Sequence, residues 1–148
     1  VRTLGADAVF DYAAGDWEKE AAAFAGARGI DCILDFIGGS YIQKNLNLLA
    51  RNGRLVQIAF LQGAKVELNL APLLTRNLTL TGSVLRPRSV GEKAAIAAAL
   101  EKKVWPLFAS GKLRVVVSAV FPLAEAQKAH ALMENSGHAG KILLAVRP

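Results

Sequence analysis

Cysteine and histidine are scarce in this sequence, which limits the metal chemistry that it can support. Cys32 is the single cysteine in 148 residues, so the chain can form neither an internal disulfide nor a four-cysteine zinc site. His130 and His138 lie far from it, and the acidic residues show no spacing typical of a metal-ligand set. We therefore expect no bound metal and, in particular, no catalytic zinc. A lone thiol also suits a reducing compartment, and we expect a cytoplasmic protein.

Long apolar runs and targeting signals are missing as well. No stretch approaches the roughly 20 apolar residues that a membrane-spanning helix needs, so we expect no membrane association. The sequence shows no charged-then-apolar leader of the secretory kind. Because it begins at Val1 and not at a methionine, we expect a processed or truncated chain.

The common short motifs of nucleotide-binding and hydrolytic enzymes are also absent. The sequence contains no G-x-G-x-x-G turn, no Walker sequence, no G-x-S-x-G and no H-E-x-x-H. Its nearest approach, Gly137-x-x-Gly140, lies between a predicted helix and a predicted strand, whereas the dinucleotide turn follows a strand and opens a helix. These motifs alone therefore indicate no reaction.

The net charge of +6 is the feature of the composition that could indicate a nucleic-acid partner. The basic residues are spread along the whole chain, and the densest groups are Arg86-Pro87-Arg88 and Lys102-Lys103. No stripe of aromatic residues alternates with them, as it tends to do in proteins that bind single strands. We interpret the charge as solvated surface and disfavour a nucleic-acid partner.

Apolar periodicity in the first half of the chain predicts alternating strands and helices. In order, the predicted elements are a strand at residues 8–12, a helix at 17–25 capped by Asp16, a strand at 30–37, a helix at 41–50 capped by Ser40, and a strand at 54–60. Short links join them. The alternation predicts an α/β protein with a parallel sheet covered by helices, because parallel neighbours need crossover connections.

The second half is less regular. Its predicted elements are a helix at 71–76 introduced by Asn69, a strand at 78–85, a helix at 89–108 that Pro106 bends or ends, a strand at 113–120, a helix at 122–135 and a strand at 140–146.

Three strand ends are candidates for a binding site, because ligands of open α/β sheets bind outside the carboxyl ends of the strands. These ends are residues 35–39, 58–63 and 83–86. Glycines there allow a ligand to approach the backbone, and free backbone groups could hydrogen-bond a carboxamide. From the pattern alone, however, turn glycines and core side chains are the better explanation of the same residues.

Several short segments then occur in an order that is typical of one enzyme superfamily. They are residues 33–41 (ILDFIGGSY), 52–56, 73–83, 82–88, 120–123, 129–134 and 138–142. The series resembles the carboxyl-terminal part of zinc-independent quinone oxidoreductases in the medium-chain dehydrogenase/reductase superfamily. The segment GSVLRPR at 82–88 is most similar to the branch that contains the p53-inducible quinone oxidoreductase.

The resemblance implies a domain organisation. Residues 1–110 would be the later part of a Rossmann-type NAD(P)-binding domain, a partial parallel sheet with helices on both faces. Residues 111–148 would be a strand, a helix and a strand that return to a catalytic domain missing from this chain. The glycine-rich turn would also lie in the missing part.

The resemblance further implies NADP(H) as cofactor and assigns residues to it. Tyr12 would pack near the adenosine 2′-phosphate, and Phe36, Ile37 and Gly38 would lie beside the adenosine and ribose. The nicotinamide half would meet two strand ends, formed by Ile58, Ala59, Phe60 and Leu61 and by Ser83, Val84 and Leu85. The loop from His138 to Lys141 would approach the phosphates or ribose. No side chain is assigned as a catalytic acid or base, because positioning and desolvation can serve hydride transfer.

The implied activity is hydride transfer from NADPH to a small-molecule quinone or a related electron-poor enone. Two alternatives remain open: an inactive fragment of a cofactor domain, and an RNA-binding relative of the quinone reductases. The resemblance also implies a homodimer that pairs through the edge strand at residues 78–84, where alternating threonines suit an exposed edge.

Overall fold

The computed structural model of the chain describes residues 2–135 and 137–146. By its internal contacts the chain forms two compact units, Val1–Arg88 and Ser89–Pro148. No helix in the described residues is long and apolar enough to cross a membrane.

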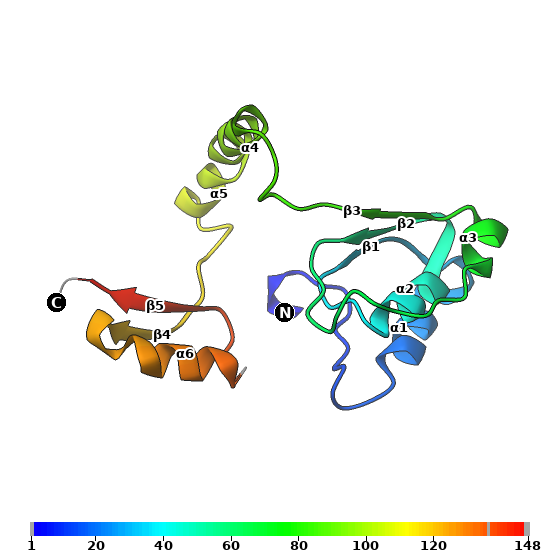
Figure 1. The fold of residues 1–148 in the computed structure, drawn as a ribbon, viewed down its shortest axis with the longest axis horizontal. Coiled ribbons are helices and arrows are strands. Elements are labelled where there is room, and N and C mark those ends of the chain that lie inside the picture. The colour runs from blue at the N-terminus through cyan, green and yellow to red at the C-terminus, as the bar shows by residue number, and fades with distance from the viewer. Residues whose placement is uncertain (1, 136, 147–148) are drawn as a thin grey trace. The chain divides into compact units, whose positions relative to one another are not determined.

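The first unit contains a three-stranded parallel sheet with the strand order β1-β2-β3. Its elements are η1 (Arg2–Leu4), α1 (Trp17–Ala25), η2 (Gly26–Arg28), β1 (Ile30–Asp35), α2 (Tyr41–Leu48), β2 (Leu49–Gln57), α3 (Ala71–Arg76) and β3 (Thr79–Gly82). Asp16 caps α1 as predicted, since its side chain accepts a hydrogen bond from the backbone N–H of Lys19 at 3.3 Å. Figure 1 shows α1 and α2 on one face of this sheet.

The core of the first unit lies between α2 and the sheet. Ile42 and Leu46 of α2 pack against Leu49 and Leu55 of β2, and all four side chains are buried. Leu55 is paired in register with residue 33 of β1 and residue 80 of β3, so it lies at the centre of the sheet. Because the strands run parallel and in register, their carboxyl ends reach the same edge of the sheet.

Arg76 of α3 forms hydrogen bonds with the backbone at the end of α2. Its guanidinium donates hydrogen bonds to three backbone carbonyls, those of Leu46 at 3.0 Å, Asn47 at 2.9 Å and Leu49 at 2.7 Å. The last carbonyls of a helix have no partner within the helix, so a cation placed there satisfies them.

The second unit contains two helices followed by a strand, a helix and a strand. Its elements are α4 (Val90–Lys103), α5 (Trp105–Ala109), β4 (Val117–Pro122), η3 (Leu123–Glu125), α6 (Ala126–Glu134) and β5 (Lys141–Ala145). β4 and β5 pair in parallel, and α6 packs against both strands (Figure 1).

The α/β class with parallel sheets flanked by helices is thus confirmed, but one predicted strand is absent. Residues 8–12 form no strand, because within the described chain no neighbour pairs with them. The other strands are shifted or shorter than predicted. β1 ends at Asp35. The side chain of Asp35 accepts hydrogen bonds from the backbone N–H groups of Ile37 and Gly38, so these groups do not pair with a neighbouring strand. β2 begins inside the predicted helix 41–50 and ends at Gln57, three residues early.

The predicted helix at 89–108 is in fact two helices that separate at Val104. Pro106 explains the break, because it lacks an N–H and its ring clashes with the preceding turn. Likewise, the predicted strands at 78–85 and 113–120 are the shorter β3 and the later β4, and the predicted helix at 122–135 is η3 followed by α6. The predicted domain boundary near residue 110 concerns a longer protein and stays a prediction.

Candidate functional site

The loops that follow β1 and β2 are joined to each other by backbone hydrogen bonds. Beyond the last strand pair, the N–H of Leu61 donates to the carbonyl of Phe36 at 3.2 Å, and that of Gln62 donates to Ile37 at 2.8 Å. The N–H of Gly39 donates back to Gly63 at 3.0 Å. Two of the three predicted strand ends therefore form one ordered structure, which we call the loop pair (residues 36–39 and 60–63).

Gly38 allows the loop pair to approach this closely. Its φ is +70°, and a Cβ placed there would lie 2.8 Å from Cδ1 of Phe60 and 3.0 Å from the carbonyl oxygen of Gly63. Gly39, with a φ of +54°, is similarly pressed against Gln62. Any other residue would be strained in backbone conformation and would also push the loops apart.

A buried carboxyl group stands beneath the first loop. Oδ1 of Asp35 accepts hydrogen bonds from the backbone N–H groups of Ile37 at 2.6 Å and Gly38 at 3.2 Å. Its Oδ2 accepts one from Nδ2 of Asn45, a residue of α2, at 3.1 Å. Asp35 is 4% exposed and Asn45 6%.

One side of the loop pair borders a cavity of about 230 Å³ rich in aromatic residues, which we call the aromatic cavity. Its lining residues are Phe10, Tyr12, Trp17, Ile33, Leu34, Asp35, Phe36, Ile37, Tyr41 and Asn45. Trp17 stacks on Tyr41 with ring centroids 5.0 Å apart, and the ammonium group of Lys44 lies 5.4 Å from the Trp17 ring centroid. Flat, apolar walls of this kind suit an aromatic ring.

A second cavity, of about 410 Å³, lies between the ends of β2 and β3, and we call it the β2–β3 cavity. It is lined by Gln57, Ile58, Ala59, Phe60, Gly82, Ser83 and Val84. The backbone N–H groups of Ala59, Phe60 and Val84 have no hydrogen-bond partner among the described residues. A ligand with a carbonyl or carboxamide group could satisfy such donors.

The side chain of Gln57 is hydrogen-bonded to the backbone that lines this second cavity. Its Nε2 donates to the carbonyl of Ala59 at 2.6 Å, while its buried Oε1 has no partner in the described chain. Gln57 pairs in register with Asp35 of β1. The last paired residues of these two strands therefore each bind the backbone of the loop that follows.

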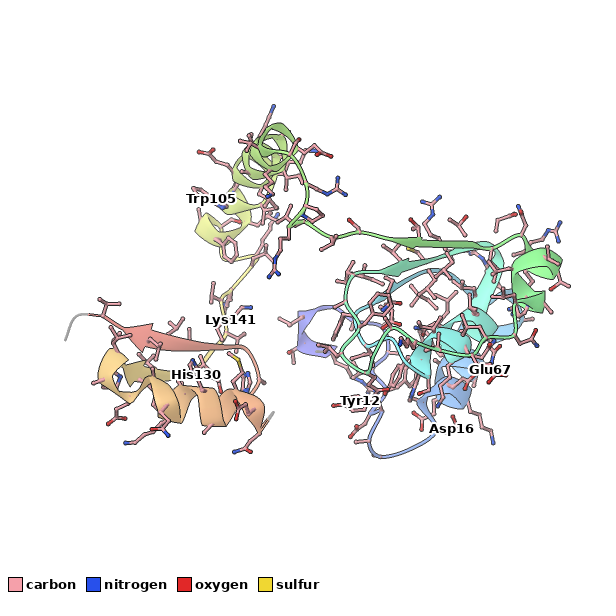
Figure 2. All side chains as sticks on the ribbon, in the orientation of Figure 1. Tyr12, Asp16, Glu67, Trp105, His130 and Lys141 are labelled. Carbon is pink, nitrogen blue, oxygen red and sulfur yellow. The ribbon has the colours of Figure 1, made fainter. Side chains whose placement is uncertain are left out.

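The structure brings most of the predicted site residues together at this edge of the sheet. Tyr12, Phe36 and Ile37 line the aromatic cavity; Ile58, Ala59, Phe60, Ser83 and Val84 line the β2–β3 cavity; and Gly38 packs between the two loops. Figure 2 shows Tyr12 in the segment that leads into α1. Leu61 and Leu85 lie outside both cavities, with exposures of 72% and 55%.

The remaining two predicted residues belong to the second unit. Lys141 begins β5 (Figure 2), and its N–H donates to the carbonyl of Val116 at 2.8 Å. Nδ1 of His138 is buried and has no partner among the described residues. Their contact with a cofactor stays a prediction.

A zinc site needs several His, Cys, Asp or Glu side chains close together. In residues 2–135 and 137–146, no group of three or more His, Cys, Asp or Glu side chains could hold a metal ion. Cys32 is exposed on β1 and stands alone.

Sequence reasoning missed the polar side chains that shape the site. Asp35 was included in the candidate strand end at residues 35–39 without a role of its own, and Asn45 and Gln57 were given no role. The available signal was an acid at the end of a buried strand, directly before an apolar pair and two glycines. Side chains of Asp and Asn in such positions commonly bind the backbone two or three residues further on.

Comparison with known proteins identifies the family. The zinc-binding dehydrogenase family matches residues 4–144. A quinone oxidoreductase of Lama guanicoe is 31% identical over 125 residues, which cover 82% of this chain and 36% of that protein. A highly reducing polyketide synthase of Gibberella zeae is 30% identical over 126 residues, which cover 85% of this chain and 5% of the synthase.

A solved structure agrees with this relationship. The quinone oxidoreductase of Thermus thermophilus, whose structures include a complex with NADPH, is 32% identical with a TM-score of 0.78. The match covers 98% of this chain and 44% of that one. The chain therefore belongs to the zinc-binding dehydrogenase family of the medium-chain dehydrogenase/reductase superfamily, and it spans less than half the length of these relatives.

Proposed function

We propose that this chain is the carboxyl-terminal part of an NADPH-dependent oxidoreductase that transfers a hydride to a quinone or a related electron-poor enone. The observation that carries the proposal is the pair of cavities at one edge of the parallel sheet. One cavity has aromatic walls, and the other is lined by three residues whose backbone N–H groups have no partner among the described residues. The Thermus thermophilus relative, which binds NADPH, supports the choice of cofactor.

We assign the two cavities to the two halves of a dinucleotide. Tyr12 and Phe36 would hold the adenosine half in the aromatic cavity, with Ile37 and Gly38 beside it. The N–H groups of Ala59, Phe60 and Val84 would bind the carboxamide of the nicotinamide half, and Ile58, Leu61, Ser83 and Leu85 would surround it. His138 and Lys141 of the second unit would approach the phosphates or ribose. When bound, NADPH supplies a hydride, and a proton from solvent completes the reduction of a quinone to a hydroquinone.

The proposed reaction needs no zinc, although the family is named for zinc binding. The described residues hold no ligand set, and we assign no side chain as a catalytic acid or base. Within the superfamily, we place the chain near the branch of the p53-inducible quinone oxidoreductase, on the strength of residues 82–88. In the whole protein, residues 1–110 would complete the cofactor domain and residues 111–148 would join the catalytic domain.

The test is the oxidation of NADPH by the full-length parent with a small quinone, with an α,β-unsaturated ketone, and without any acceptor. We expect turnover that depends on the acceptor and resists metal chelators. A parent that oxidises NADPH with neither acceptor would contradict the proposed activity. Loss of turnover on chelation, with recovery on adding zinc, would contradict the metal-free assignment.

Titration of this chain with NADPH, followed by cofactor fluorescence, tests the alternative of an inactive fragment. Saturable binding at micromolar concentrations favours the reductase interpretation, and no binding favours the inactive one. An RNA-binding function predicts instead an affinity for RNA that falls steeply with salt, because phosphate contacts release counterions.

A further inference from the structure

We propose that Asp35 and Asn45 form a buried pair that positions the cofactor-binding loops, so that both are positioning residues for the proposed reaction. The inference rests on the proposed function for its ligand, but its geometric basis is independent of it. Asp35 and Asn45 are the two buried polar side chains among the residues that line the aromatic cavity.

The hydrogen bonds of Asp35 set the direction in which the chain leaves β1. A strand that continued straight would point its next N–H groups at a neighbouring strand. Here Oδ1 of Asp35 takes the N–H groups of Ile37 and Gly38, and the chain bends over the carboxyl group. The bend places Phe36 on the wall of the aromatic cavity, half-exposed to a ligand.

Asn45 completes the arrangement from the opposite side. Its Nδ2 donates to the second carboxyl oxygen, so the carboxyl group cannot rotate without losing this bond. Asn45 belongs to α2, which packs on the sheet through Ile42 and Leu46. The loop after β1 is therefore tied to the packed core of the unit.

The effect extends to the second cavity through the loop pair. The carbonyl of Ile37, whose N–H is held by Asp35, accepts the N–H of Gln62, and the carbonyl of Phe36 accepts that of Leu61. Displacement of the first loop would therefore displace the second loop as well. That second loop begins at Phe60, which lines the β2–β3 cavity.

Stability alone does not explain such a pair. Burial of a carboxyl group costs free energy, and its hydrogen bonds recover roughly that amount and little more. Well-packed apolar residues often stabilise a core equally well. The pair does provide one defined backbone conformation, because only an acceptor at this point satisfies both N–H groups.

The experiment compares four variants of the full chain in NADPH binding, thermal unfolding and backbone amide NMR. Asp35→Ala removes both acceptor oxygens. Asp35→Asn keeps one oxygen to accept the backbone N–H groups, and the amide of Asn45 can rotate so that its oxygen accepts a hydrogen bond from the new Nδ2. Asn45→Leu leaves Oδ2 unpaired. Asp31→Ala is the matched control, since Asp31 lies on the same strand but is exposed and, among the described residues, its side chain pairs with Arg28.

We expect Asp35→Ala to raise the dissociation constant of NADPH by about tenfold or more, which corresponds to ~1.4 kcal/mol. Asn45→Leu should raise it by a smaller factor, while Asp35→Asn and Asp31→Ala should stay within about threefold of wild type. The measurements are made well below the unfolding temperature, where a merely less stable protein is still folded and binds NADPH with unchanged affinity. Wild-type affinity in Asp35→Asn, together with weakened binding in Asp35→Ala, would therefore distinguish a positioning role of Asp35 from a role in stability alone.

The amide signals of Ile37 and Gly38 provide a test that needs no ligand. They should shift in Asp35→Ala more than the signals of β2 do, and return toward wild type in Asp35→Asn. Unchanged signals in Asp35→Ala would overturn the positioning role, even if the wild type failed to bind NADPH. Binding by the wild type with equal affinity in Asp35→Ala would overturn it too, and would leave the proposed function standing.

Discussion

Replacement of Gly38 by alanine tests whether the close approach of the two loops shapes the site. The new Cβ would be held at a φ of +70° and would meet Cδ1 of Phe60 at 2.8 Å and the carbonyl of Gly63 at 3.0 Å. A left-handed conformation costs an alanine about 1–2 kcal/mol. The Phe60 ring can turn aside, but the carbonyl of Gly63 is backbone, so the loops must separate. With the loss of one or two hydrogen bonds at about 1 kcal/mol each, the total is about 2–4 kcal/mol.

Gly63→Ala is the control, because its φ of +99° is also unfavourable while no atom lies within 4 Å of the added Cβ. It should cost only the conformational part, about 1–2 kcal/mol. In a Trp105→Phe background, urea unfolding followed by the fluorescence of Trp17 reports the first unit alone. Equal destabilisation by the two glycine substitutions would refute the close-approach argument. We also expect Gly38→Ala, but not Gly63→Ala, to weaken NADPH binding at temperatures where both are folded.

Three further predictions concern parts of the chain away from the loop pair. Arg76→Met should lower the free energy of unfolding of the first unit by about 2–3 kcal/mol in urea titrations, because three carbonyls lose a charged donor. Arg51→Met, which removes one contact of 3.5 Å, should cost less than about 0.5 kcal/mol, and equal effects would contradict this account. Ser89→Ala removes the capping box of α4 and should destabilise that helix by about 1 kcal/mol, seen as lower helicity by circular dichroism, with Ser89→Thr close to wild type. Thr81→Lys, which places like charges on the exposed edge strand β3, should shift the proposed dimer toward monomer in sedimentation, and a wild-type monomer at high concentration would exclude that dimer.

The sequence predicted the elements of this fold well where one strong local pattern decides them. The apolar run before Gly38 identified β1, and Pro106 correctly marked the break after α4. The strand at residues 8–12 was wrongly predicted, because its composition suits a strand but a strand also needs a neighbour to pair with. The end of β2 at Gln57 was missed for a related reason. Strand pairing stops there, and the carbonyl of Ala59 accepts a hydrogen bond from the Gln57 side chain instead of from a neighbouring strand.

The proximity of the candidate strand ends was predictable from the sequence, but the contacts that hold them together were not. Adjacent strands of a parallel sheet bring their carboxyl ends to one edge, so the three candidate strand ends could be placed together from the order of elements alone. The hydrogen bond between Asp35 and Asn45 joins residues ten positions apart on different elements, and no periodicity encodes it. The loop pair likewise depends on which N–H groups remain after each strand ends.

A candidate site built from backbone groups carries no short side-chain motif in the sequence. Three residues that line the β2–β3 cavity, Ala59, Phe60 and Val84, have backbone N–H groups without a partner among the described residues, and every residue except proline carries such a group. Their availability depends on conformation, because the N–H groups of Ile37 and Gly38 are taken by Asp35 while those of Ala59 and Phe60 stay unpaired among the described residues. Chemistry at such a site is encoded in the residues that direct the backbone, which are buried acids, amides and closely packed glycines. Substitutions at these positions should therefore alter cofactor binding more than substitutions of the exposed side chains at the cavity rims.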